Sequence, residues 1–137
     1  MEINGIAHIF LTVSNYDACA GFYEPLLHFF GMKTVIKYGG YLYCVGGRTA
    51  VGISAAAPEH AGARFVQQRI GLHHVSFRAR ERADVDACYE FVKQLGGTIV
   101  HPPEDGPWAP GYYSLLFEDP DGIRLEINHV PGKGLLV

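Results

Sequence analysis

The chain has few cysteines, no basic cluster and no long apolar run, and each shortage excludes a class of protein. Its three cysteines are Cys19, Cys44 and Cys88. They form an odd set without C-x-x-C spacing, which argues against a disulfide framework and against a thiolate zinc site. Cys19 and Cys88 lie in apolar helical stretches, where we expect small buried side chains.

Positive charge is also sparse. The 11 Lys and Arg residues are scattered singly, and the formal net charge is -3. A nucleic-acid partner requires a basic stripe against its phosphates, so none is expected. No apolar run reaches the length of a membrane span, and the first residues lack the pattern of a secretory signal. We therefore expect no membrane partner and a cytoplasmic location.

Two stretches of the chain are near copies of each other. Residues 5–10, Gly-Ile-Ala-His-Ile-Phe, place His8 inside an apolar run, and residues 71–76, Gly-Leu-His-His-Val-Ser, do the same with His74. In both cases Asp-Ala-Cys, an apolar helical stretch and glycine follow. Self-similarity of this length predicts a repeated structural unit.

The repeat sets the domain organisation. A chain of 137 residues is long enough for one core and too short for two ordinary domains. We therefore predict a single domain made of a module at 4–57, a linker at 58–69 with one helical turn, and a second module at 70–131.

Each module is predicted to contain a strand, a helix and three further strands. The strands expected from apolar alternation and turn signals are 5–13, 33–38, 41–45, 49–54, 72–78, 98–101, 112–117 and 123–128. The first helix is capped by Ser14 or Asn15 and ends at Phe30, with Pro25 expected to divide or kink it. The second helix is expected at 83–95.

Alternation places candidate functional side chains on one face of their strands. His8 and Phe10 share a face in the first strand, opposite an aliphatic face suited to the helix. The last strand follows a tight-turn sequence at 119–122, Asp-Pro-Asp-Gly. Beyond that turn the residues that share the polar face of the strand are Arg124, Glu126 and Asn128.

Two histidines and one acid form a plausible metal-ligand set. Neutral imidazoles and a carboxylate can hold one divalent ion, Fe, Mn, Co, Ni or Zn, and leave coordination positions open. We predict His8, His74 and Glu126 as ligands, with His73 a lesser candidate than His74. The simpler alternatives are histidines with local partners and a Glu126 carboxylate paired with Arg124.

The repeated plan, the paired histidines and residues 117–127, Phe-Glu-Asp-Pro-Asp-Gly-Ile-Arg-Leu-Glu-Ile, resemble the vicinal oxygen chelate superfamily. That group includes glyoxalase I, extradiol dioxygenases and bleomycin-binding proteins. The resemblance implies an α+β fold in which two tandem βαβββ modules form a cup-shaped, partly open mixed β-barrel with helices outside. It also implies a cup closed within one chain or across a dimer, and we expect a homodimer.

One departure from the repeat is informative. Aligning the last strands of the two modules places Gly52 where the second module has Glu126. Glyoxalase I generally takes a fourth protein ligand from the first half, so a site with three protein ligands fits this chain better.

Several side chains are expected to contact a small-molecule substrate. Trp108, with Tyr112 or Tyr113, is expected to pack on it from a Pro- and Gly-rich segment, although a surface loop anchored by one aromatic explains the segment equally well. The residues predicted to bind substrate are Phe10, Trp108, Tyr113, Arg124 and Asn128.

The reaction expected from the resemblance uses the ion as a Lewis acid. Two substrate oxygens would chelate it, and an enolate or alkoxide would form during isomerase, lyase or epimerase chemistry. The alternatives are an extradiol-type dioxygenase using Fe(II) or Mn(II), and a non-catalytic drug-binding protein of the bleomycin-resistance kind. The sequence does not identify a general base.

Overall fold

The computed structural model describes residues 1–133 and divides the chain into two compact units, Met1–Arg64 and Phe65–Val137. Each unit is described by itself. The division falls between Arg64 and Phe65, inside the segment that the sequence analysis assigns to the linker. The helical turn expected there is a 3-10 helix, η1, at Pro58–His60.

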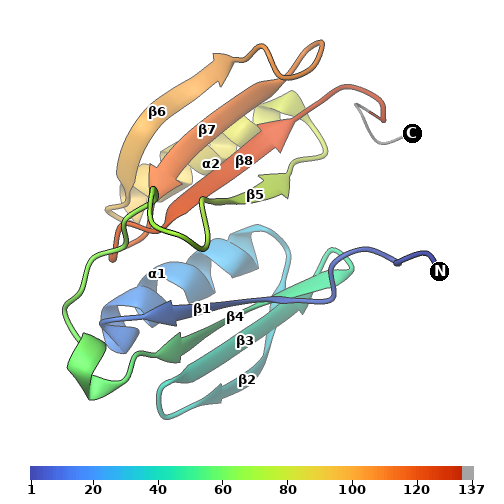
Figure 1. The fold of residues 1–137 in the computed structure, drawn as a ribbon. Helices are drawn as coiled ribbons and strands as arrows, with labels where there is room; N and C mark the ends of the chain where they lie inside the picture. Colours follow the sequence, from blue (N-terminus) through green and yellow to red (C-terminus); the bar gives the residue numbers. More distant parts are fainter. Residues whose placement is uncertain (134–137) are drawn as a thin grey trace. The chain divides into compact units, whose positions relative to one another are not determined.

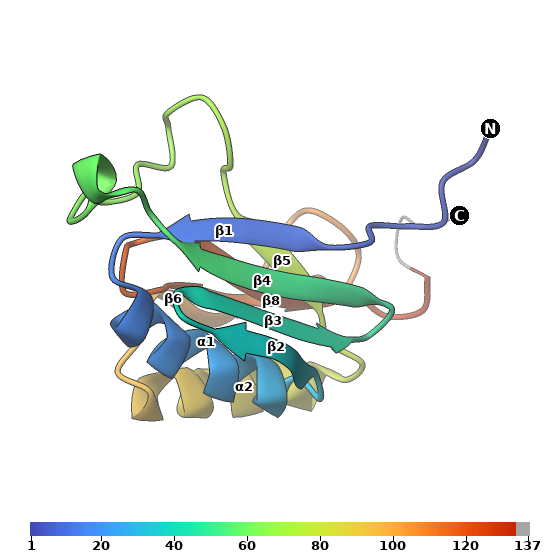
Figure 2. The same ribbon diagram turned by 90° about the horizontal axis from the view of Figure 1, so that it is seen from below.

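The first unit is one mixed sheet with one helix (Figure 1). Its elements in chain order are β1 (Ile9–Val13), α1 (Tyr16–Phe29), β2 (Lys33–Tyr38), β3 (Tyr41–Gly46) and β4 (Thr49–Ala55). The strand order is β1-β4-β3-β2, with β1 parallel to β4 and the other pairs antiparallel. Figure 2 shows these strands side by side in that order.

The second unit repeats this topology. Its elements are β5 (Val75–Arg78), α2 (Arg82–Gln94), β6 (Thr98–Asp105), β7 (Tyr113–Glu118) and β8 (Arg124–His129). The strand order is β5-β8-β7-β6, and β5 is again the strand that pairs in parallel, with β8. The prediction of an α+β fold built from two tandem βαβββ modules is therefore confirmed.

Helix α1 begins and ends where its sequence allows. The Asn15 side chain accepts a hydrogen bond from the Ala18 amide at 3.1 Å, which satisfies one of the free N–H groups of the first turn. Gly31 follows the helix with a φ of +79°, a conformation that favours glycine. The helix continues through Pro25, so this proline does not divide it. Neither α-helix within residues 1–133 is long and apolar enough to span a bilayer.

Each sheet buries one face against its own helix. In the second unit the helix residues Val85, Cys88 and Val92 are fully buried, as are Leu115 and Leu125 of the sheet. Cys19 of α1 is buried in the corresponding way, so the expectation of small buried cysteines is confirmed at both matching positions. Burial raises the pKa of the Cys88 thiol to about 12.

Two strands of the second unit differ in length from the prediction. Strand β5 starts at Val75, after His73 and His74, because the residues before it do not pair with β8. Strand β6 extends to Asp105 and runs through two prolines. It tolerates them because it lies at the edge of the sheet, where its pairing with β7 is broken by register shifts.

Candidate functional site

Polar side chains of β5 and β8 gather on the sheet face opposite α2. Along β8, Leu125 and Ile127 are buried, whereas Arg124, Glu126 and Asn128 are partly exposed. This alternation is the one the sequence predicts for a strand with a single core face. In the neighbouring strand β5, the residue paired with Glu126 is Ser76.

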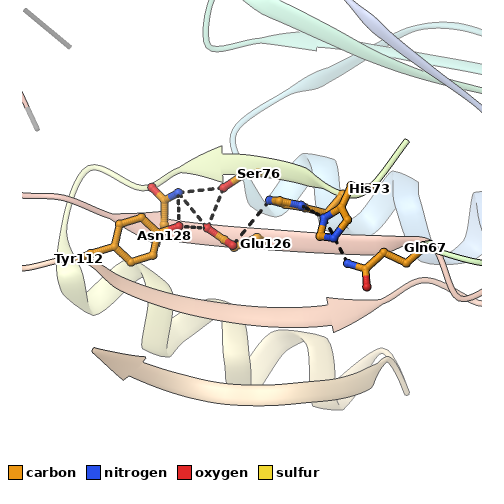
Figure 3. Close-up of polar contacts among 7 residues, drawn as sticks. Gln67, His73, Ser76, Tyr112, Glu126 and Asn128 are labelled. Carbon is orange, nitrogen blue, oxygen red and sulfur yellow. Dashed lines mark hydrogen bonds and ion pairs between the residues drawn. The ribbon is translucent and has the colours of Figure 1, made fainter. Parts of the chain in front are cut away.

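Three side chains donate hydrogen bonds to one oxygen of Glu126. Ser76 Oγ donates to Glu126 Oε1 at 3.0 Å, Asn128 Nδ2 donates to the same atom at 3.0 Å, and the Tyr112 hydroxyl is also bonded to it. Asn128 further contacts Ser76 Oγ at 2.8 Å and the Tyr112 hydroxyl at 3.2 Å. Figure 3 shows these four residues as one connected network. Because Oε1 is shared by three donors, the carboxylate is held in one orientation.

The second oxygen of Glu126 faces His74. Glu126 Oε2 lies 3.9 Å from His74 Nε2, and the two side chains are 13% and 35% exposed. His74 also contacts His73, with 2.7 Å between their Nδ1 atoms. Two of the three predicted metal ligands, His74 and Glu126, are thus brought together in the second unit.

Tyr112 is the functional candidate that the structure favours over its neighbour. Burial and, next, its hydrogen bond to Glu126 raise the pKa of the Tyr112 hydroxyl to about 12. The hydroxyl therefore remains protonated at neutral pH and serves as a donor to the carboxylate. From the sequence, Tyr112 is only one of two possibilities, because it lies at one end of the strand predicted at 112–117, and the observed strand β7 starts one residue later, at Tyr113.

Tyr113, predicted to bind substrate, packs against helix α2. It is the first residue of β7, is 9% exposed, and its hydroxyl donates to Asp86 of α2 at 2.6 Å. The guanidinium of Arg82, also in α2, lies 3.5 Å from the centre of its ring. Tyr113 therefore faces the helix, away from Glu126, because adjacent residues at a strand start point to opposite sides.

Arg124 and Trp108 are not engaged with Glu126 within residues 1–133. Arg124 Nε donates to Glu118 Oε1 at 3.0 Å, across the β7–β8 pair. The alternative of a Glu126–Arg124 ion pair is therefore wrong. Trp108 is 72% exposed, in the segment before β7, and its indole lies beside Gly106.

The open face of the first unit is aromatic. The Phe10 ring stacks on Tyr43 with centroids 5.7 Å apart and lies 5.1 Å from the Tyr41 ring. Tyr38 in turn stacks on Tyr41 at 5.2 Å. His8 precedes β1. Its imidazole ring packs edge to face with the rings of Phe10 and Tyr43, with ring centroids 6.1 and 6.2 Å apart. This face presents rings where the second unit presents polar groups.

The Phe10 ring covers Gly52, the first-unit position that corresponds to Glu126. Gly52 pairs with Phe10 across β1 and β4, as Glu126 pairs with Ser76 across β5 and β8. A Cβ atom at Gly52 would lie 2.3 Å from Phe10 Cζ, so only glycine leaves room for this ring. The place where a fourth ligand would stand is therefore filled by a phenyl group.

Substituting Gly52 by Ala is expected to displace the Phe10 ring from Tyr43. Because Phe10 is 37% exposed and its ring can move outward, the expected loss in free energy of unfolding is about 1 kcal/mol, at the low end for overpacking. Urea denaturation of Gly52→Ala, Phe10→Ala and the double variant measures it. The cost should vanish in the Phe10→Ala background; an equal cost in both backgrounds would contradict the contact.

The residues of the second unit fit part of a divalent metal site. An imidazole nitrogen and a carboxylate oxygen are suitable donors for first-row divalent ions. Within residues 1–133, however, no group of three or more His, Cys, Asp or Glu side chains is arranged to hold a metal ion. His8 belongs to the first unit, whereas His74 and Glu126 belong to the second.

Comparison with known proteins gives a consistent result over nearly the whole chain. The family model of the Glyoxalase/Bleomycin resistance protein/Dioxygenase superfamily matches residues 5–127. The uncharacterized protein YqjT of Bacillus subtilis (strain 168) is 28% identical over 122 residues, which cover 88% of this chain and 94% of that protein.

Solved structures share the fold. A glyoxylase/bleomycin resistance protein/dioxygenase domain from Frankia sp. EAN1pec superposes with a TM-score of 0.76 at 25% identity, covering 93% of this chain and 98% of that one. Lactoylglutathione lyase from Agrobacterium tumefaciens gives a TM-score of 0.68 at 23% identity, covering 94% and 96%. At this identity the likeness to the lyase concerns the fold alone.

Proposed function

Because the chain belongs to the Glyoxalase/Bleomycin resistance protein/Dioxygenase superfamily, we propose that it is a divalent-metal-dependent enzyme of glyoxalase-like type. Its substrate is a small organic molecule that offers two oxygens to the metal. The reaction class is isomerase, lyase or epimerase chemistry. His74 and Glu126 hold the ion, and His8 is proposed as the third ligand on the strength of the module repeat.

One observation carries the proposal. Three donors hold Glu126 by Oε1, and Oε2 is turned toward His74 Nε2. Because all three donors bind Oε1, Oε2 is the oxygen that remains to bind an ion on the side of His74. Hydrogen bonds to the outer side of a ligating carboxylate are typical of metal centres, where they orient the ligand.

The surrounding residues have separate roles in the proposed enzyme. A bound divalent ion supplies a Lewis acid that stabilises negative charge on substrate oxygens. Ser76 and Tyr112 orient Glu126, and Asn128 links the two hydroxyls. Phe10, with the tyrosines stacked around it, is proposed to pack against the organic part of the substrate.

The proposed function is tested by loading the protein with metal. Protein purified without chelators is assayed for bound metal, then reconstituted anaerobically with Fe(II), Mn(II), Co(II), Ni(II) or Zn(II). We expect about one bound ion per chain. We also expect turnover of a compound with adjacent oxygens. Oxygen uptake with catechols would favour the dioxygenase alternative, and ligand binding without any metal would favour the drug-binding alternative.

A homodimer in the cytoplasm remains part of the proposal. Light scattering of the purified chain checks the assembly, for which we expect twice the mass of 15.1 kDa. A monomer at all concentrations would contradict the dimer without affecting the metal proposal.

Replacing Tyr112 by Phe is expected to weaken divalent metal binding by about 10-fold. The change removes one of the donors to Glu126 Oε1 but leaves Ser76 and Asn128 in place, so the effect should fall at the low end for an outer-shell partner. Titration with Co(II) followed by calorimetry measures it.

Tyr113→Phe is the matched control for this substitution. It removes the same hydroxyl from the adjacent residue, whose partner is Asp86 on the helix side. We expect a loss of about 1 kcal/mol in free energy of unfolding, as for an ordinary hydrogen bond, and unchanged Co(II) affinity. Equal effects of both variants on affinity would contradict the role assigned to Tyr112.

A further inference from the structure

We propose that Gln67 and His73 are positioning residues that fix the tautomer of His74, so that its Nε2 atom presents a lone pair toward Glu126. The inference rests on the proposed function for its consequence, metal binding, but its direct readout requires no metal.

The contacts run in a line from a loop to the start of β5. Gln67 Nε2 lies 3.3 Å from His73 Nδ1, and His73 Nδ1 lies 2.7 Å from His74 Nδ1. The two imidazole rings meet edge to face, with centroids 5.0 Å apart and an interplanar angle of 72°. Figure 3 shows Gln67 and His73 together, apart from the group formed by Tyr112 and Asn128.

The donors and acceptors determine where the protons lie. A side-chain amide nitrogen only donates, so Gln67 requires His73 Nδ1 to accept. A neutral imidazole carries one proton, which His73 must then hold on Nε2. His74 Nδ1 therefore donates in the 2.7 Å contact, since two unprotonated nitrogens would repel each other, and the single lone pair of His73 Nδ1 is shared between this short contact and the longer one from Gln67. This leaves His74 Nε2 without a proton.

An unprotonated His74 Nε2 is suited to binding a cation together with Glu126. His74 Nε2 lies 3.9 Å from Glu126 Oε2, and both atoms then carry a lone pair that can bind a cation. A cation can be held there, and no N–H group of His74 blocks it. Ligating histidines usually have their other nitrogen fixed by a carboxylate, a carbonyl or water. Here the residue that fixes it is a second histidine, oriented in turn by an amide.

The tautomers are read from long-range ¹H–¹⁵N correlation spectra of the metal-free full chain at pH 8, where a free histidine side chain is neutral. We expect the Nδ1–H form for His74 and the Nε2–H form for His73. His73→Phe removes the acceptor, so the spectrum of His74 should show a mixture of both forms. The Kd for Co(II) should rise about 10- to 100-fold, as for the loss of an outer-shell partner.

A second variant reverses the polarity of the contact. Gln67→Glu replaces the donor by an acceptor of the same length, so it should draw the Nδ1 proton onto His73 and away from His74. Gln68→Glu adds the same charge at the next residue, and we expect both tautomers to stay as they are in the unaltered chain.

Each outcome decides the inference. An Nε2–H form of His74 in the unaltered chain means that the amide of Gln67 is turned the other way and overturns it. A pure Nδ1–H form of His74 that persists in His73→Phe also overturns it. If the tautomers behave as expected while the unaltered chain binds no Co(II), the positioning role stands and the proposed metal function fails.

Discussion

Replacing Glu126 by Gln is expected to weaken binding of Co(II) or Mn(II) by more than about 100-fold, beyond the range for outer-shell partners. Glutamine keeps an oxygen for the donors Ser76, Tyr112 and Asn128. It places an amide nitrogen, which does not ligate metals, where Oε2 faces His74. The fold should therefore persist while the ligand is lost, which circular dichroism and calorimetric titration measure together.

Glu118→Gln provides a matched control for this substitution. Glu118 lies on the same sheet face, in β7, and its carboxylate accepts a hydrogen bond from Arg124. The same loss of charge there should change metal affinity by less than about 3-fold, because Glu118 is paired with Arg124 and acts on the ion only through a screened charge interaction. A Glu126→Gln variant that binds metal as tightly as this control would exclude Glu126 as a ligand.

The second large effect concerns the turn before β8. Asp119 is 4% exposed, and its Oδ1 accepts hydrogen bonds from the amides of Asp121 and Ile123, both at 2.8 Å. Asp119→Ala leaves these two donors without that partner, at about 1–3 kcal/mol each. We expect the free energy of unfolding to fall by about 2–6 kcal/mol, measured by urea denaturation.

Asp119→Asn distinguishes the contribution of the two hydrogen bonds from that of the carboxylate charge. Asparagine keeps a side-chain oxygen of the same length that can accept from both amides. Most of the stability should therefore be retained, with a loss near 1 kcal/mol. If the Asn variant is as unstable as the Ala variant, the carboxylate charge and not the pair of amide contacts stabilises the turn.

The repeat made the fold predictable from sequence. Apolar alternation located the strands, and the copy of His8 at His74 implied the same topology in both units, which the strand orders confirm. The asymmetry between Gly52 and Glu126 was also visible in the sequence. The ring of Phe10 over Gly52 was not, because it depends on the pairing of β1 with β4.

The finer features of the site depend on register and on single residues at strand ends. Arg124 pairs with Glu118 because β7 and β8 place them opposite each other, which spacing along one strand cannot show. Tyr112 and Tyr113 are adjacent, and only the start of β7 decides which one faces Glu126. The contact of His73 with Gln67 joins a loop to a strand start and has no periodic signal.

The network around Glu126 has an entropic consequence. A free glutamate side chain loses about 1.5–2 kcal/mol of rotamer freedom when it is immobilised. Ser76, Tyr112 and Asn128 impose that loss during folding, so an arriving ion does not have to order the carboxylate. By this term alone, an ion would bind about 10- to 30-fold more tightly than to the same carboxylate left mobile.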